Sequence, residues 1–78
     1  MLTRISREQL TQKVLAAVRQ QPGCEGVKEV AVTPVEVLDQ GTDWHVNVVD
    51  EGDAKMEVAY NAAQQVHDRL ITRFELED

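Results

Sequence analysis

The sequence predicts an α+β domain in which two amphipathic helices cover one face of an antiparallel β-hairpin. Three observations indicate this class. A stretch with helical periodicity opens the chain, two valine-rich stretches flank a glycine-containing turn, and a longer helical stretch closes the chain. The predicted order is therefore helix, strand, strand, helix, within one domain over residues 1–78.

The first helix is predicted over residues 6–21. Ser6 is a favourable N-cap, and Gln9 three residues later completes a capping box. Pro22 cannot continue a helix and Gly23 tolerates unusual backbone angles, so the helix is expected to end there. The apolar stripe has four members: Leu10, Val14, Ala17 and Val18.

The first strand is predicted in the valine-rich segment of residues 27–37. Its alternation changes phase at Pro34, because Val30 and Val32 share one phase and Val35 and Val37 share the other. A bulge near residues 33–34 would return all four valines to one face.

A tight turn centred on residues 40–41 is predicted to close the hairpin, with Gly41 supplying a positive φ. This register places Val37 opposite Trp44 and Val35 opposite Val46. Strand alternation then puts Trp44 on the covered face of the second strand. Three residues face the opposite way: His45, Asn47 and Val49.

The second helix is predicted over residues 53–74, with Asp53 as its N-cap. A helix of that length spans about 30 Å, more than a short hairpin can cover, so its end is expected to need another surface. Its predicted apolar face comprises Met56, Ala59, Tyr60, Ala63, Val66, His67, Leu70, Ile71 and Phe74.

Size and free strand edges together predict a homo-oligomer, most simply a dimer. A domain of 78 residues has a thin core, and Cys24 is the single cysteine, so no disulfide forms within the chain. A two-stranded sheet is marginal alone, and its edges attract pairing. A dimer would continue the sheet or pack the long helices together.

The charge balance argues against nucleic-acid and membrane partners. The net charge is −6 and the basic residues are scattered, so phosphate backbones and anionic lipids would repel the chain. No apolar run approaches the roughly 18–20 residues of a membrane span, and the first residues do not resemble a secretory signal. A cytoplasmic location is expected.

The residue patterns predict neither a catalytic site nor a cofactor, and they favour a non-enzymatic interaction or self-assembly module. Cys24 follows a helix C-terminus, which disfavours a thiolate, and His67 is expected to be a partly buried core or interface histidine. The carboxylates of the strands are interpreted as a solvated face and turn: Glu29, Glu36, Asp39 and Asp43.

Two surfaces remain as candidates. The first is the outward strand face of His45, Asn47 and Val49, where a partner protein or a second copy would bind. The alternative is a small metal or ligand site near His45, Asp50 and Asp53, formed within one subunit or between two. The acidic segment does not follow the spacing of an EF-hand, and no zinc-ligand spacing occurs, so no metal site is assigned.

Overall fold

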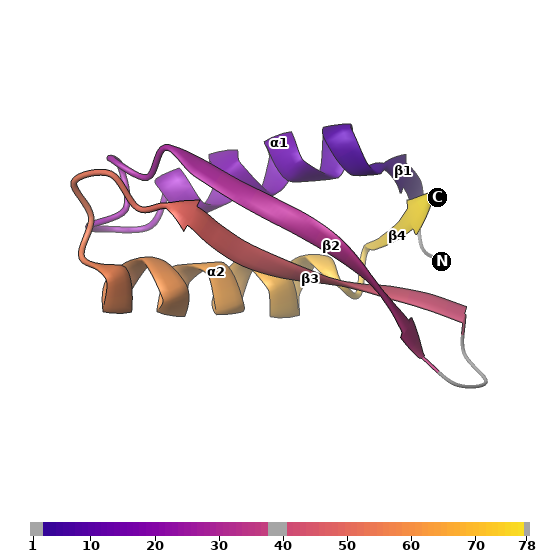
Figure 1. Cartoon of the computed structure of the whole chain (residues 1–78). Helices are drawn as coiled ribbons and strands as arrows, with labels where there is room; N and C mark the ends of the chain where they lie inside the picture. The colour runs from indigo at the N-terminus through magenta and orange to yellow at the C-terminus, as the bar shows by residue number, and fades with distance from the viewer. Residues whose placement is uncertain (1–2, 38–40, 78) are drawn as a thin grey trace.

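The computed structural model confirms the α+β class and the central hairpin, and it contains two further strands (Figure 1). It describes residues 3–37 and 41–77. The elements along the chain are β1 (Thr3–Ser6), α1 (Arg7–Arg19), β2 (Glu29–Val37), β3 (Gly41–Asp50), α2 (Met56–Leu70) and β4 (Phe74–Glu77).

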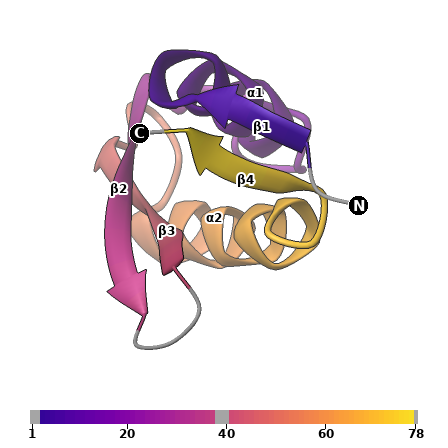
Figure 2. The same cartoon turned by 90° about the vertical axis from the view of Figure 1, so that its right-hand side faces the viewer.

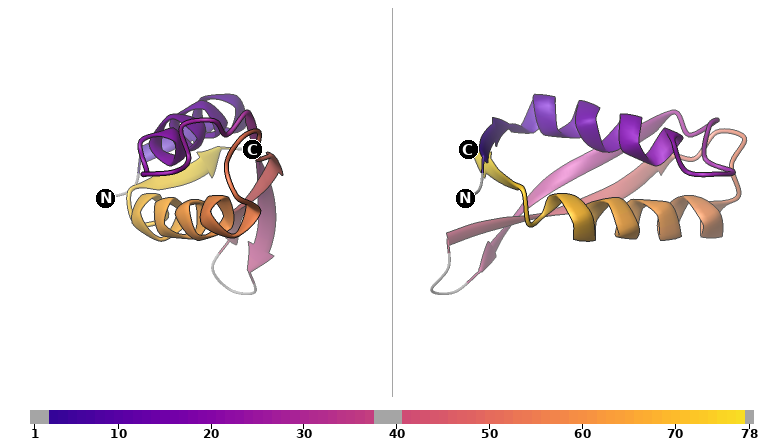
Figure 3. Two further views of the ribbon diagram at one scale, coloured as in Figure 1. Left: turned by 90° about the vertical axis from the view of Figure 1, so that its left-hand side faces the viewer. Right: turned by 180° about the vertical axis from the view of Figure 1, so that it is seen from behind.

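The antiparallel hairpin of β2 and β3 forms one layer and the two helices form the other. α1 packs on β2, α2 packs on β3, and the helices also contact each other. β1 and β4 pair in parallel at the end of the molecule where both termini lie (Figure 2). Val37 at the end of β2 and Gly41 at the start of β3 lie in the part of the hairpin that projects past the end of α2 (Figure 3). The predicted turn centred on residues 40–41 lies in part outside the described residues.

Helix α1 forms as predicted and ends two residues earlier. The Ser6 side-chain oxygen accepts a hydrogen bond from the Gln9 N–H at 3.2 Å, which confirms the N-cap. The buried side chains of the helix are Leu10, Val14 and Val18, three of the four predicted members of the apolar stripe. Gly23, just after the helix, has a φ of 86°.

The predicted register of the hairpin and the predicted bulge near residues 33–34 are wrong. The pairing runs without a break from Val30 opposite Val48 to Val37 opposite Gly41, so Pro34 faces Trp44 and Val35 faces Asp43. The irregularity lies at the other end of the hairpin, between Glu29 and Val30. Val35 therefore shares the outer face with Ala31 and Thr33.

Pro34 fits an unbroken ladder because of where the Trp44 backbone points. The Trp44 carbonyl oxygen lies 2.9 Å from Nε2 of His67 on α2, and α2 packs on β3 rather than on β2. That carbonyl therefore points away from β2, so Pro34 and Trp44 form a non-hydrogen-bonded pair. No ladder bond is lost at a proline in that position, and no bulge is needed.

The prediction of one helix over residues 53–74 is wrong at both ends. Lys55 occupies the N-cap position of α2 without a side-chain cap, and Asp53 lies in the loop before it. After Leu70 the chain turns, with the Arg73 N–H bonded to the Leu70 carbonyl at 2.9 Å, and continues as β4. The end of the chain thus supplies a strand instead of an unsupported helical turn.

Strands β1 and β4 pair through their backbones and place one buried apolar pair, among the described side chains, in the core. Ile5 of β1 lies opposite Leu76 of β4, and both side chains are buried in the core. The Trp44 indole Nε1–H donates to the Phe74 carbonyl at 3.2 Å, which ties the hairpin to the start of β4. This short parallel pair closes the end of the helical layer.

Candidate functional site

The outer face of the hairpin carries the three residues that the sequence placed there. His45, Asn47 and Val49 are exposed on β3, and Val49 keeps 55 % of its surface accessible. The helices cover the inner face of the hairpin, where Val30, Val32 and Trp44 are buried.

Helix α2 adds exposed apolar side chains beside this face. Met56, Tyr60 and His67 recur at spacings of four and seven residues, so they lie along one stripe of the helix. His67 contacts His45, so this stripe borders β3. Met56 and Tyr60 keep 54 % and 48 % of their surfaces accessible.

The predicted packing of Met56 and Tyr60 in the core is therefore wrong. The buried stripe of α2 is narrow and consists of small side chains: Ala59, Ala62, Ala63 and Val66. Their spacing of i, i+3, i+4 and i+7 defines the core-facing side, and Met56 and Tyr60 lie on its flank. The spacing of the alanines is the feature of the sequence that distinguishes the core-facing residues of α2 from Met56 and Tyr60.

Counting residues from the contact of His45 with His67 places Val49 near the level of Met56 and Tyr60 along α2. β3 and α2 run in opposite directions (Figure 1), and His45 is in contact with His67. Four strand residues from His45 to Val49 span about 14 Å. On the helix that distance equals about nine residues back from His67, which falls between Met56 and Tyr60. We call the set of His45, Asn47, Val49, Met56 and Tyr60 the β3–α2 surface.

His67 lies at the lateral edge of β3 and touches both faces of the strand. Its ring is stacked on the His45 ring, with centroids 5.4 Å apart, and meets the Trp44 ring edge-on at 5.1 Å. Its Nε2 lies 2.9 Å from the Trp44 carbonyl oxygen and its Nδ1 lies 3.2 Å from Oδ1 of Asp68. The Gln64 amide also donates to Oδ1 of Asp68, at 3.0 Å.

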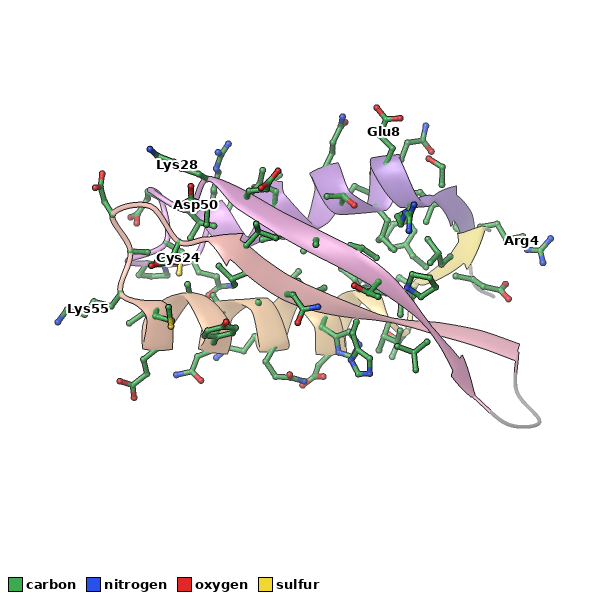
Figure 4. The ribbon with its side chains drawn as sticks, in the orientation of Figure 1. Arg4, Glu8, Cys24, Lys28, Asp50 and Lys55 are labelled. Carbon is green, nitrogen blue, oxygen red and sulfur yellow. The ribbon has the colours of Figure 1, made fainter. Side chains whose placement is uncertain are left out.

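The residues of the alternative metal site do not meet within one subunit. Asp50 lies five strand residues from His45, a separation of about 17 Å. Its carboxylate accepts the Gly52 N–H at 2.9 Å, at the end of the molecule where Lys28 and Cys24 also lie (Figure 4). Over residues 3–37 and 41–77, no three histidine, cysteine or acidic side chains gather as metal ligands.

The predicted strand carboxylates form no described cluster either. Glu29 is exposed at the first position of β2. Asp39, together with the side chains of Glu36 and Asp43, lies outside the described part of the structure.

The Cys24 thiol is fully buried, with Sγ 3.7 Å from the Val58 carbonyl oxygen. Burial raises the pKa of the Cys24 thiol above its ordinary value, and the neighbouring Glu25 carboxylate raises it further. An activated nucleophile needs the opposite shift.

We expect native protein to react with a dissolved thiol reagent far more slowly than unfolded protein, because the Cys24 thiol is inaccessible and neutral. The raised pKa also means that this thiol stabilises the fold below its unfolded pKa, and that the contribution is lost as pH rises through the folded pKa. The checks are reagent kinetics with and without denaturant, and unfolding of wild type and Cys24→Ala above about pH 8.5. Equal labelling rates in the two states would contradict the burial.

A groove of about 640 Å³ runs between α1 and β2. Its walls are formed by Arg7, Glu8, Thr11 and Gln12 of the helix and by residues 30–33 of the strand. Val30 and Val32 have the same phase as Pro34, so their backbone N–H and C=O groups point away from β3 toward the unpaired edge. This edge has the polar backbone groups that an extended segment would pair with. Sequence reasoning anticipated free edges but not this groove.

No family model matches the chain, and neither the curated proteins nor the solved structures contain a significant match. In the described residues no helix combines the length and the apolar character that crossing a membrane requires.

Proposed function

We propose that this chain is a non-enzymatic interaction module that associates with a second copy of itself through the β3–α2 surface. The observation that carries the proposal is the uncovered outer side of a two-stranded hairpin, bordered by Val49, Met56 and Tyr60 with about half of each side chain exposed. A cytoplasmic location belongs to the same proposal, supported by the unpaired thiol of Cys24.

The energetics of the fold favour covering this surface. A domain of this size buries roughly 60 % of the surface of its unfolded chain, so its core is thin. A two-stranded hairpin depends on packing against other elements, and here the helices pack on one face. Each apolar Å² removed from water contributes about 25 cal/mol. Two copies that stack their outer faces would form a sandwich of two hairpins with the helices outside.

The side chains of the outer face suit such stacking. Ala31 and Thr33 of β2 are small, and Asn47 of β3 carries an amide that can hydrogen-bond across a two-fold axis. A two-fold interface uses the same patch on both copies, so a self-complementary surface needs no second site.

The test is the molar mass in solution from micromolar to millimolar concentration, by light scattering after size exclusion. Wild type is expected to approach twice 8.8 kDa. Val49→Glu and Tyr60→Glu each place a charge in the interface and are expected to weaken the dimer at least tenfold. Gln65→Glu is the matched control, because it is an exposed position of α2 outside the β3–α2 surface and adds the same charge.

Two outcomes would contradict the proposal. A wild-type mass of 8.8 kDa at every concentration excludes self-association. A dimer that neither variant weakens, while circular dichroism shows the fold unchanged, moves the interface to another surface, with the α1–β2 groove as the next position to mutate.

A further inference from the structure

Both ring nitrogens of His67 face atoms that only accept hydrogen bonds. Nε2 lies 2.9 Å from the Trp44 carbonyl oxygen, and Nδ1 lies 3.2 Å from a carboxylate oxygen of Asp68. A neutral imidazole carries one N–H and can donate to one of these partners, whereas an imidazolium donates to both. The geometry thus fits a doubly protonated ring.

His45 limits how much charge the cluster can hold. Its ring lies parallel to the His67 ring, with 14° between the planes and 5.4 Å between the centroids. A neutral His45 ring presents its π face to the His67 cation, while a protonated one places two positive rings face to face.

We propose that His67 and His45 together carry one positive charge, with His67 doubly protonated and His45 neutral, and that this singly charged pair is a pH-sensitive clasp between α2 and the edge of β3. The contacts all lie within one subunit, so the inference does not depend on self-association. Among the residues with described side chains, the charged or titratable groups in contact with His67 are Asp68 on its own helix and His45 on β3; its other contact, Trp44, is uncharged.

The clasp weakens on both sides of the singly charged state. Loss of the proton leaves His67 with one N–H for two acceptors, so its contribution to stability is present at lower pH and is lost as pH rises through the titration of the ring. Protonation of His45 gives the opposite pH dependence, a stability that falls as pH falls. The reason is that two positively charged rings repel and push α2 away from β3.

The consequence reaches the exposed surface of the molecule. His45 belongs to the β3–α2 surface, and its ring is held in place by the stack on His67. Opening the clasp releases the His45 ring from its stack on His67 and removes the His67 Nε2 contact of the Trp44 carbonyl oxygen.

The first measurement is the protonation state of both histidines in the intact wild-type chain, from long-range proton–nitrogen correlation spectra at pH 7. Two protonated nitrogens are expected for His67 and one for His45. A single N–H on His67 at this pH would overturn the inference, and this readout needs no variant.

The second measurement is the denaturation midpoint between about pH 5 and pH 8.5, the range in which histidine titrates. His67→Gln is expected to abolish the fall on the alkaline side, and His45→Phe, which keeps a ring and takes no proton, to abolish the fall on the acid side. The chain has two histidines, so the double variant gives the baseline of all other groups. A wild-type profile parallel to that baseline would refute the clasp.

Discussion

Replacing Trp44 with alanine is expected to remove a large fraction of the stability of the fold. Trp44 is the largest of the fully buried side chains, with 1 % of its surface accessible. Truncation of a buried tryptophan to alanine costs about 3–5 kcal/mol. A domain of this length has a total stability of roughly 4–12 kcal/mol, so the loss is a large fraction of the whole.

The position of Trp44 makes the cavity hard to close. Its ring meets the His67 ring edge-on, and its indole N–H donates to the Phe74 carbonyl, so one side chain joins the hairpin to α2 and to β4. Alanine leaves the Phe74 carbonyl without the indole N–H donor and also removes the edge-on contact of the His67 ring.

Chemical denaturation followed by circular dichroism measures the effect, because the variant lacks the single tryptophan needed for fluorescence. Trp44→Phe is the control: it keeps an aromatic ring but loses the N–H and some volume, and a loss of about 1–2 kcal/mol is expected. If the alanine variant unfolds within about 1 kcal/mol of wild type, Trp44 does not hold these elements together.

The elements that could be predicted from the sequence are those with local signals. Ser6 caps α1 through a bond to a residue three positions away, and the apolar stripe of that helix is set by its own periodicity. The hairpin follows from valine-rich segments around a glycine, and alternation along β3 correctly placed His45, Asn47 and Val49 on the exposed side.

The elements that could not be predicted depend on contacts between distant residues. The sequence around Pro34 predicts a bulge. That prediction fails because the Trp44 carbonyl bonds His67, which lies 23 residues further along the chain. β1 and β4 are four residues each, too short for a periodic signal, and their pairing joins the two ends of the chain. Ile5 and Leu76 lie opposite each other because both pack into the core that α1 and α2 help to form.

The candidate site divides in the same way. The exposed residues of β3 could be predicted from the alternation of the strand. The stacking of His45 on His67 could not, because it depends on how α2 crosses the edge of β3. The acidic residues near Asp50 looked like ligands because they are adjacent in sequence. In the structure the Asp50 carboxylate stabilises the loop, because it accepts the Gly52 N–H.

The second large predicted effect concerns that loop. Gly52→Ala is expected to lower the free energy of unfolding by about 2–4 kcal/mol, through backbone strain and a steric overlap. Gly52 has a φ of 57°, a conformation that costs an alanine about 1–2 kcal/mol. An added Cβ would also overlap the Gly26 carbonyl oxygen and lie 3.2 Å from the Lys28 side chain. The Lys28 N–H bonds the Asp50 carbonyl at 2.9 Å, so the two loops cannot separate without losing that bond.

Gly23→Ala is the control that separates the two causes of the Gly52 effect. Gly23 also has a positive φ, 86°, but a Cβ there would meet a methyl group of Val58 at 3.3 Å, and a side chain can move aside. The difference between the two denaturation midpoints therefore measures the close approach of the loops at Gly26 and Gly52. Equal midpoints would mean that backbone strain alone explains the loss and that the loops tolerate a wider spacing than the structure shows.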